Sequence, residues 1–132
     1  MLFGENSFGW FIYKSQKVQT LDKIGGYFMI EMQDVYMTYP NGVSALNGIN
    51  ITIDQGEFVY VVGPSGAGKS TFTKIIFREE VPTKGKVVVN DKETSALKWK
   101  DVPYFRRNIG VVYQDFRLLP KMTVYENIAF AH

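Results

Sequence analysis

The alternation of apolar and polar residues between positions 30 and 53 predicts two strands. Apolar residues recur at every second position from Ile49 to Ile53, which is the spacing of a strand with one buried face. The apolar segments 30–32 and 35–39 come before it, and the sequence Pro-Asn-Gly at 40–42 is a turn signal. The pattern therefore predicts a hairpin-like region that turns at these three residues.

The period of the apolar positions changes further along the chain. Residues 58–62 form an unbroken run of β-branched and aromatic side chains, which predicts a short strand. Apolar positions within 71–77 then have helical spacing, and this helix must end before Pro82. Residues 86–89 predict the next strand, closed by the turn residues Asn90 and Asp91.

Three more elements are expected after position 100. Asp101 is a candidate N-cap for a short helix that runs to Arg107, with a proline in its first turn. Residues 109–113 predict another buried strand. Thr123 and Glu126 match a capping box, so a last helix should begin there and continue to the end of the sequence.

Residues 1–28 do not follow this plan. They have no clear apolar period and contain several aromatic residues that look exposed. We interpret them as an appended N-terminal segment, with Met29 as a plausible start of translation and residues 29–132 as the domain. The first residues also lack the basic and apolar regions of a secretory signal.

The segment between the predicted strand at 58–62 and the predicted helix at 71–77 is a complete G-x-x-x-x-G-K-[ST] phosphate-binding loop. Its residues are Gly63, Pro64, Ser65, Gly66, Ala67, Gly68, Lys69 and Ser70. Backbone N–H groups of such a loop and the following helix N-terminus cradle phosphates, while the lysine reaches the β- and γ-phosphates and the hydroxyl ligates Mg²⁺. The alternative is a glycine-rich turn before a helix, but the strand–loop–helix order favours a nucleoside-triphosphate site.

Composition narrows the protein class without adding chemistry. The chain has 132 residues, 45% of them hydrophobic, and a net charge of +2 without a long basic run, so we expect one globular domain and no nucleic-acid partner. The absence of cysteine excludes disulfides, zinc knuckles and a thiol nucleophile. No apolar run reaches the roughly 18 residues of a membrane span, and we expect a cytoplasmic protein.

Residues 29–132 resemble the nucleotide-binding domain of ABC ATPases, and within that family the bacterial cell-division (FtsE) group. The phrases that carry the resemblance are 57–72, which contains the loop, 78–80 (Arg-Glu-Glu), 102–103 (Val-Pro), 106–107 (Arg-Arg), 114–120 (Gln-Asp-Phe-Arg-Leu-Leu-Pro) and 123–127 (Thr-Val-Tyr-Glu-Asn). The fold class implied is an α/β P-loop NTPase, the N-terminal portion of an ABC-type domain. It joins a β-rich subdomain to the strand–loop–helix unit.

The resemblance also implies roles for individual residues. Tyr39 would stack on adenine, the loop extended to Thr71 would bind ATP with Mg²⁺, and Lys69 would act in catalysis. Gln114 would be the Q-loop glutamine that positions Mg²⁺ and water. Tyr39 as a surface aromatic and Gln114 as a polar strand cap remain alternatives.

Partners are implied as well. The full-length family members form homodimers and work with an integral membrane protein, FtsX in the cell-division group, at the inner face of the membrane. Phe116, Leu118 and Leu119 are either core residues or anchors for that partner. Arg106 and Arg107 favour a solvated helix face over a ligand site.

The family's later motifs do not occur in this sequence. There is no L-S-G-G-Q signature, no Walker B strand and no switch histidine, and His132 lies too early for that last role. We therefore expect the front half of an ABC ATPase, which binds ATP without efficient hydrolysis. The alternatives are a methionine-import or lipoprotein-release ATPase, a non-hydrolysing nucleotide-binding module and, least favoured, a P-loop kinase or GTPase.

Overall fold

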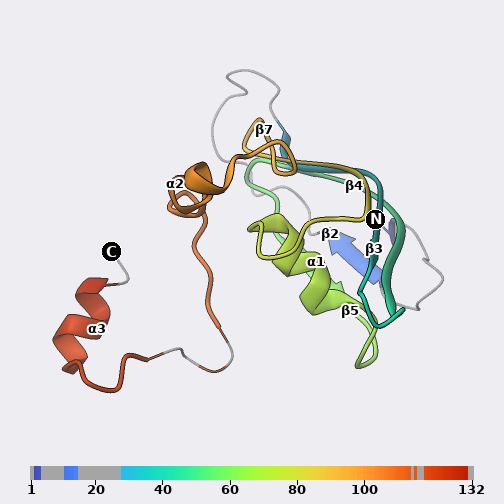
Figure 1. Cartoon of the computed structure of the whole chain (residues 1–132). Coiled ribbons are helices and arrows are strands. Elements are labelled where there is room, and N and C mark those ends of the chain that lie inside the picture. Colours follow the sequence, from blue (N-terminus) through green and yellow to red (C-terminus); the bar gives the residue numbers. More distant parts are fainter. Residues whose placement is uncertain (1, 4–10, 15–27, 114, 116–117, 131–132) are drawn as a thin grey trace.

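The computed structural model describes residues 2–3, 11–14, 28–113, 115 and 118–130 (Figure 1). Its strands are β1 (Leu2–Phe3), β2 (Phe11–Lys14), β3 (Phe28–Thr38), β4 (Ser44–Asp54), β5 (Val59–Val62), β6 (Lys84–Val89) and β7 (Lys92–Glu93). Its helices are α1 (Lys69–Ile76), the 3₁₀ turn η1 (Trp99–Asp101), α2 (Val102–Arg106) and α3 (Val124–Phe130). Most of the strands surround α1, and α3 lies away from them.

Strands β3 and β4 form the predicted hairpin. They pair antiparallel within a sheet of order β4-β3-β6-β7. At the turn, the Tyr39 N–H donates to the Val43 carbonyl and the Gly42 N–H donates to the Tyr39 carbonyl, both at 2.9 Å. Gly42 has a φ of 84°, a conformation that glycine adopts without a steric penalty.

A bulge lets both hairpin strands keep one apolar face. Met32 and Val35 are both buried although they are three residues apart, and the same holds for Leu46 and Ile49. A strict period of two would place one member of each pair on the opposite face. The pairing register of β3 with β4 shifts between Met32 and Val35, which returns the later residues to the buried side.

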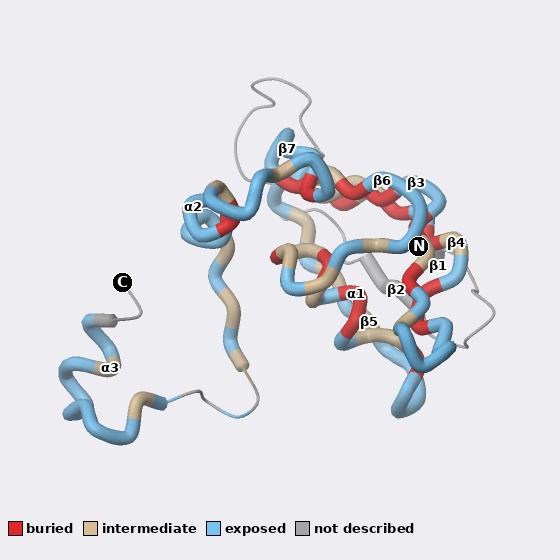
Figure 2. The backbone as a smooth tube through the Cα atoms, viewed as in Figure 1, coloured by how far each residue is buried: buried red, intermediate tan, exposed pale blue. Residues whose placement is uncertain are grey.

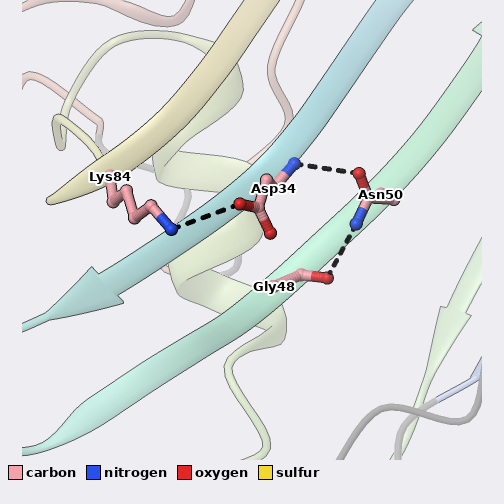
Figure 3. Close-up of polar contacts among 4 residues, drawn as sticks. All are labelled: Asp34, Gly48, Asn50 and Lys84. Atoms are coloured by element: carbon pink, nitrogen blue, oxygen red, sulfur yellow. Dashed lines mark hydrogen bonds and ion pairs between the residues drawn. The ribbon is translucent and has the colours of Figure 1, made fainter.

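Polar side chains stabilise the backbone at this bulge (Figure 3). Asp34 has a φ of 50°, and its N–H donates to Asn50 Oδ1 at 2.9 Å. The Asn50 amide in turn donates to the Gly48 carbonyl at 3.1 Å, and Lys84 Nζ lies 3.3 Å from a carboxylate oxygen of Asp34. These bonds satisfy groups that the broken ladder leaves unpaired.

The hydrophobic core lies between the four-stranded sheet and α1. Figure 2 shows buried residues along these strands and within α1. Phe72 and Ile75 of α1 are 3% and 0% exposed, and Phe105 of α2 joins the same cluster. Ala67 of the loop is a further buried member, and the sheet contributes the others: Met32, Val35, Met37, Leu46, Ile49, Ile51, Ile53, Val87 and Val89.

Strand β5 belongs to a second sheet of order β1-β2-β5 and pairs antiparallel with β2. Val59 and Val61 pack against the core, whereas Tyr60 and Val62 are 55% and 41% exposed. The strand that leads into the loop is therefore covered on one face. The Phe58 and Tyr60 rings meet edge to face on the exposed side, with their centroids 4.7 Å apart.

Residues 109–113 are not a strand, so that prediction is wrong. The segment has no regular secondary structure, and Val112 is 99% exposed. Apolar content alone does not form a strand, because its N–H and C=O groups need a neighbouring strand. In the described part of the chain, no strand pairs with this segment.

The helix predicted after Asp101 is present, but the predicted cap is not. The Asp101 side chain makes no capping hydrogen bond, and Asp101 has a helical φ and ψ of −92° and −15°. It lies inside a continuous turn because η1 leads directly into α2. An N-cap residue must be non-helical to aim its side chain at the following N–H groups.

The capping box at the start of α3 is confirmed. A Glu126 carboxylate oxygen accepts bonds from the Thr123 N–H and hydroxyl at 2.7 and 2.8 Å, and the Glu126 N–H donates to Thr123 Oγ1 at 3.3 Å. None of the helices in the described residues has the length and apolar composition needed to cross a bilayer.

Candidate functional site

The predicted phosphate-binding loop connects the end of β5 at Val62 to the start of α1 at Lys69. Gly63, Pro64, Ser65 and Gly66 are exposed, whereas Ala67 is buried. Gly68 is the N-cap of α1, and no side chain caps the helix there. The positive end of the helix dipole therefore faces the loop, as an anion site requires.

Gly68 must be glycine for two structural reasons. Its φ of 90° is strained for any residue with a Cβ. A Cβ at this position would also overlap the carbonyl oxygen of Ala45 and lie 3.2 Å from a Leu46 methyl carbon. Strand β4 thus packs directly against the last residue of the loop and fixes the start of α1.

The Lys69 side chain reaches back over the loop. Its ammonium donates to the carbonyl oxygens of Gly63 and Pro64, at 2.8 and 2.6 Å. The positive charge of the side chain and the positive end of α1 therefore converge on the same loop.

Ser70 and Thr71 follow Lys69 in the first turn of α1 but lie in different environments. Ser70 is exposed, whereas Thr71 is 7% exposed. The Thr71 hydroxyl lies 3.1 Å from the phenolic oxygen of Tyr39, so the two share a hydrogen bond. Tyr39 packs against the core while its hydroxyl touches the loop helix.

The structure thus brings Tyr39 to the loop across 32 positions of sequence. Nothing in the sequence signalled this hydroxyl contact, because it depends on the hairpin turning back over α1.

The sequence pattern also did not indicate the role of Arg106, whose guanidinium donates to the carbonyl oxygens of Phe77 and Arg78 at 2.9 Å each. Arg106 therefore binds the end of α1 rather than only solvent.

Two of the predicted residues, Gln114 and Phe116, lie outside the described residues, as does His132. Leu118 is 67% exposed, and Leu119 is half-buried. The Leu119 N–H and C=O are both bonded to the side-chain amide of Asn127, at 2.8 and 3.3 Å. Of the two described residues among the three predicted apolar anchors, Leu118 is therefore the one that is exposed to solvent.

Ser70 suits the way in which Mg²⁺ binds beside phosphates. No group of three or more His, Cys, Asp or Glu side chains within the described ranges could enclose a metal ion. Mg²⁺ keeps several waters and takes one or two protein ligands together with substrate phosphates. The exposed Ser70 hydroxyl, next to Lys69 in the first turn of α1, fits that mode.

Residues 46–132 match the ABC transporter family. The chain belongs to this family. The loop, the helix α1 and the segment up to α3 all lie within the matched range.

Curated relatives agree with this assignment. The chain is 67% identical over 103 residues to the cell division ATP-binding protein FtsE of Bacillus subtilis, covering 78% of this chain and 45% of that protein. FtsE of Streptococcus pneumoniae is 53% identical over the same length, and the phosphonates import ATP-binding protein PhnC of Lactococcus lactis is 45% identical. The chain spans less than half the length of these relatives.

Solved ABC cassettes share the fold. The ATP-binding cassette MJ0796, a dimer bound to ADP and Pi, aligns with a TM-score of 0.70 at 37% identity and covers 78% of this chain and 46% of that one. The structure of cbiO1 from Clostridium perfringens, part of the transporter complex cbiONQ, aligns with a TM-score of 0.65 at 26% identity over 78% of this chain and 41% of that one. The fold is therefore the N-terminal portion of an ABC-type nucleotide-binding domain, as predicted.

Proposed function

We propose that this chain is the ATP-binding part of an FtsE-like ATPase subunit, which couples ATP use to a membrane partner in bacterial cell division. The observation that carries the proposal is the convergence of the Lys69 ammonium and the positive end of α1 on one glycine-rich loop. Both favour a polyanion at that point. A triphosphate has the charge and size that such a loop binds.

Each residue of the site then has a defined role in binding Mg-ATP. Lys69 leaves the carbonyl oxygens of Gly63 and Pro64 and pairs with the β- and γ-phosphates, while the loop N–H groups bond the phosphate oxygens. Ser70 would hold Mg²⁺, and the metal would neutralise phosphate charge. Tyr39 would stack on the adenine ring, and Gln114 would orient water and help to hold the metal in the full-length enzyme.

Calorimetric titration of the purified chain with Mg-ATP tests the proposal, with Lys69→Ala and Lys74→Ala compared side by side. Both lysines lie on α1, but Lys74 is near the opposite end, 3.9 Å from Glu79. The Lys69 variant should lose at least tenfold in affinity, because it lacks the cation of the loop, and the Lys74 variant should bind as the parent does. Equal affinity in the parent and in Lys69→Ala would sink the assignment.

The choice of an FtsE-like subunit over an importer rests on similarity. The FtsE of Bacillus subtilis is 67% identical and the PhnC of Lactococcus lactis 45% identical, each over 103 residues. An ATPase subunit of an importer is the second candidate, because the phosphonate-import proteins match as well. Like the dimeric MJ0796 cassette, the full-length protein would act as a homodimer, bound at the inner face of the membrane.

We further propose that the segment 118–127 contributes to the surface that meets a cytoplasmic helix of the FtsX-like partner. Leu118 is one of the exposed apolar residues of this segment and the proposed anchor, and a helix in a groove needs such contacts. In the full-length protein, Leu118→Ser should reduce recovery of the partner in pull-down experiments. Trp99→Ser is the matched control because it removes an exposed apolar residue, 81% exposed, outside this segment; equal loss in both variants would argue against the proposed surface.

A further inference from the structure

The hydrogen bond between Tyr39 and Thr71 joins the two ends of the proposed nucleotide site. Tyr39 follows β3, and its backbone is held on both sides by the turn bonds to Val43 and Gly42. Thr71 comes directly after Lys69 and Ser70. One contact of 3.1 Å therefore links the aromatic residue to the turn of α1 that carries the phosphate-binding residues.

Thr71 is well placed to fix the position of the Tyr39 ring. It is 7% exposed, and its β-branched side chain has restricted rotation in a helix. Tyr39 is partly buried and packs against the core, so part of the residue remains accessible to solvent. A ring anchored at its backbone and at its hydroxyl loses the rotation about Cα–Cβ that would swing it away from the loop.

We propose that Thr71 is a positioning residue for base recognition: its hydroxyl holds the Tyr39 ring where it can stack on the nucleotide base. The inference rests on the proposed function. It divides the affinity for ATP into two parts. The part directed at the base depends on the Tyr39–Thr71 bond, and the part directed at the phosphates depends on Lys69 and the loop.

Calorimetry with two probes, Mg-ATP and Mg-tripolyphosphate, separates the two parts, because tripolyphosphate has the phosphates and no base. Stacking should make the parent chain bind ATP roughly 5- to 150-fold more tightly than tripolyphosphate. Thr71→Val and Tyr39→Phe each remove one hydroxyl and retain the shape of the side chain. Each should weaken ATP binding about 2- to 10-fold and weaken tripolyphosphate binding clearly less.

Two further variants test whether the bond itself is responsible. Thr71→Ser keeps the hydroxyl and should restore ATP affinity. The double variant Thr71→Val/Tyr39→Phe should bind ATP no more weakly than either single variant, because both break the same bond. If the two losses multiply, or if Thr71→Val weakens both probes equally, Thr71 acts on the loop or the phosphates and the inference is wrong.

Failure of the proposed function looks different. If the parent chain binds tripolyphosphate through Lys69 but binds ATP no more tightly, the phosphate site is supported and the base-recognition inference is wrong. A parent chain that binds neither probe overturns the proposed function, and the inference fails with it.

Discussion

The Arg106 guanidinium donates from Nε to the carbonyl oxygen of Phe77 at 2.9 Å and from Nη2 to that of Arg78 at 2.9 Å. Phe77 and Arg78 directly follow α1, and Arg78 adopts the left-handed conformation with a φ of 62°. Carbonyl groups at a helix C-terminus lack partners within the helix. An arginine of α2 therefore caps the helix that begins at Lys69.

Loss of this cap should destabilise the fold. We expect Arg106→Ala to lower the free energy of unfolding by about 1–3 kcal/mol, the range for bonds that involve a charged group. Arg107→Ala is the matched control: Arg107 is exposed and lies 4.9 Å from the centroid of the Tyr104 ring. Arg107→Ala should lower the free energy of unfolding by less than about 0.5 kcal/mol. Urea denaturation measures both, and equal costs would contradict the capping role of Arg106.

Two glycines of the loop should respond differently to alanine. Gly66 and Gly68 both have positive φ, 79° and 90°, so each substitution costs about 1–2 kcal/mol in backbone strain. Only at Gly68 would the new methyl group overlap the Ala45 carbonyl, whereas at Gly66 nothing lies within 4 Å of it. Gly68→Ala should therefore lower the midpoint of thermal unfolding clearly more than Gly66→Ala. Equal shifts would mean that β4 does not pack on the loop as described.

The capping box predicts a pH dependence at α3. The backbone N–H of Thr123, and then its hydroxyl, hold the pKa of Glu126 below its ordinary value. Because the folded-state pKa is lowered, the stabilisation of α3 is present above the ordinary glutamate pKa and is lost as the pH falls through the lowered value. The protection of the α3 amides, measured relative to their intrinsic exchange rates at each pH, should fall over that window.

Substitution of Thr123 isolates the hydroxyl from the backbone bond. In Thr123→Ala the backbone N–H bond can remain, so the Glu126 pKa should rise only part of the way toward its ordinary value. An NMR titration of the Glu126 carboxyl carbon measures this change. A pKa that does not move would exclude the hydroxyl as a contributor.

We predict that this 132-residue chain does not turn over ATP at a useful rate. Phosphoryl transfer to water needs a positioned water and several groups that stabilise charge, and this sequence supplies only the loop side of that arrangement. Phosphate release by the purified chain should match that of Lys69→Ala. Lys69-dependent turnover on the order of 1 s⁻¹ would refute the prediction.

Residues 1–28 should be dispensable for the four-stranded sheet and for nucleotide binding. A chain that begins at Met29 loses the pairing of β2 with β5 and the Phe28–Asp54 pair at the end of the hairpin, but keeps α1, the loop and the rest of β3 and β4. We expect it to bind Mg-ATP with the affinity of the parent and to unfold at a similar temperature. Clearly weaker binding or a large drop in melting temperature would show that the N-terminal segment belongs to the fold.

Short-range patterns determined several features of this protein. The phosphate-binding loop, the turn after Tyr39 and the Thr123–Glu126 capping box were all predicted from neighbouring residues. Their chemistry depends on backbone conformation and on side chains within a few positions. Local sequence is sufficient to specify such features, and it located the helix α1 and the hairpin strands as well.

Tertiary contacts decided the rest. Residues 109–113 have strand-like composition but no strand beside them, because pairing depends on distant parts of the chain. Asp101 lost its capping role because a preceding turn made its backbone helical. The bonds of Tyr39 to Thr71 and of Arg106 to Phe77 join residues 32 and 29 positions apart, and only packing of the hairpin and of α2 against α1 brings them together.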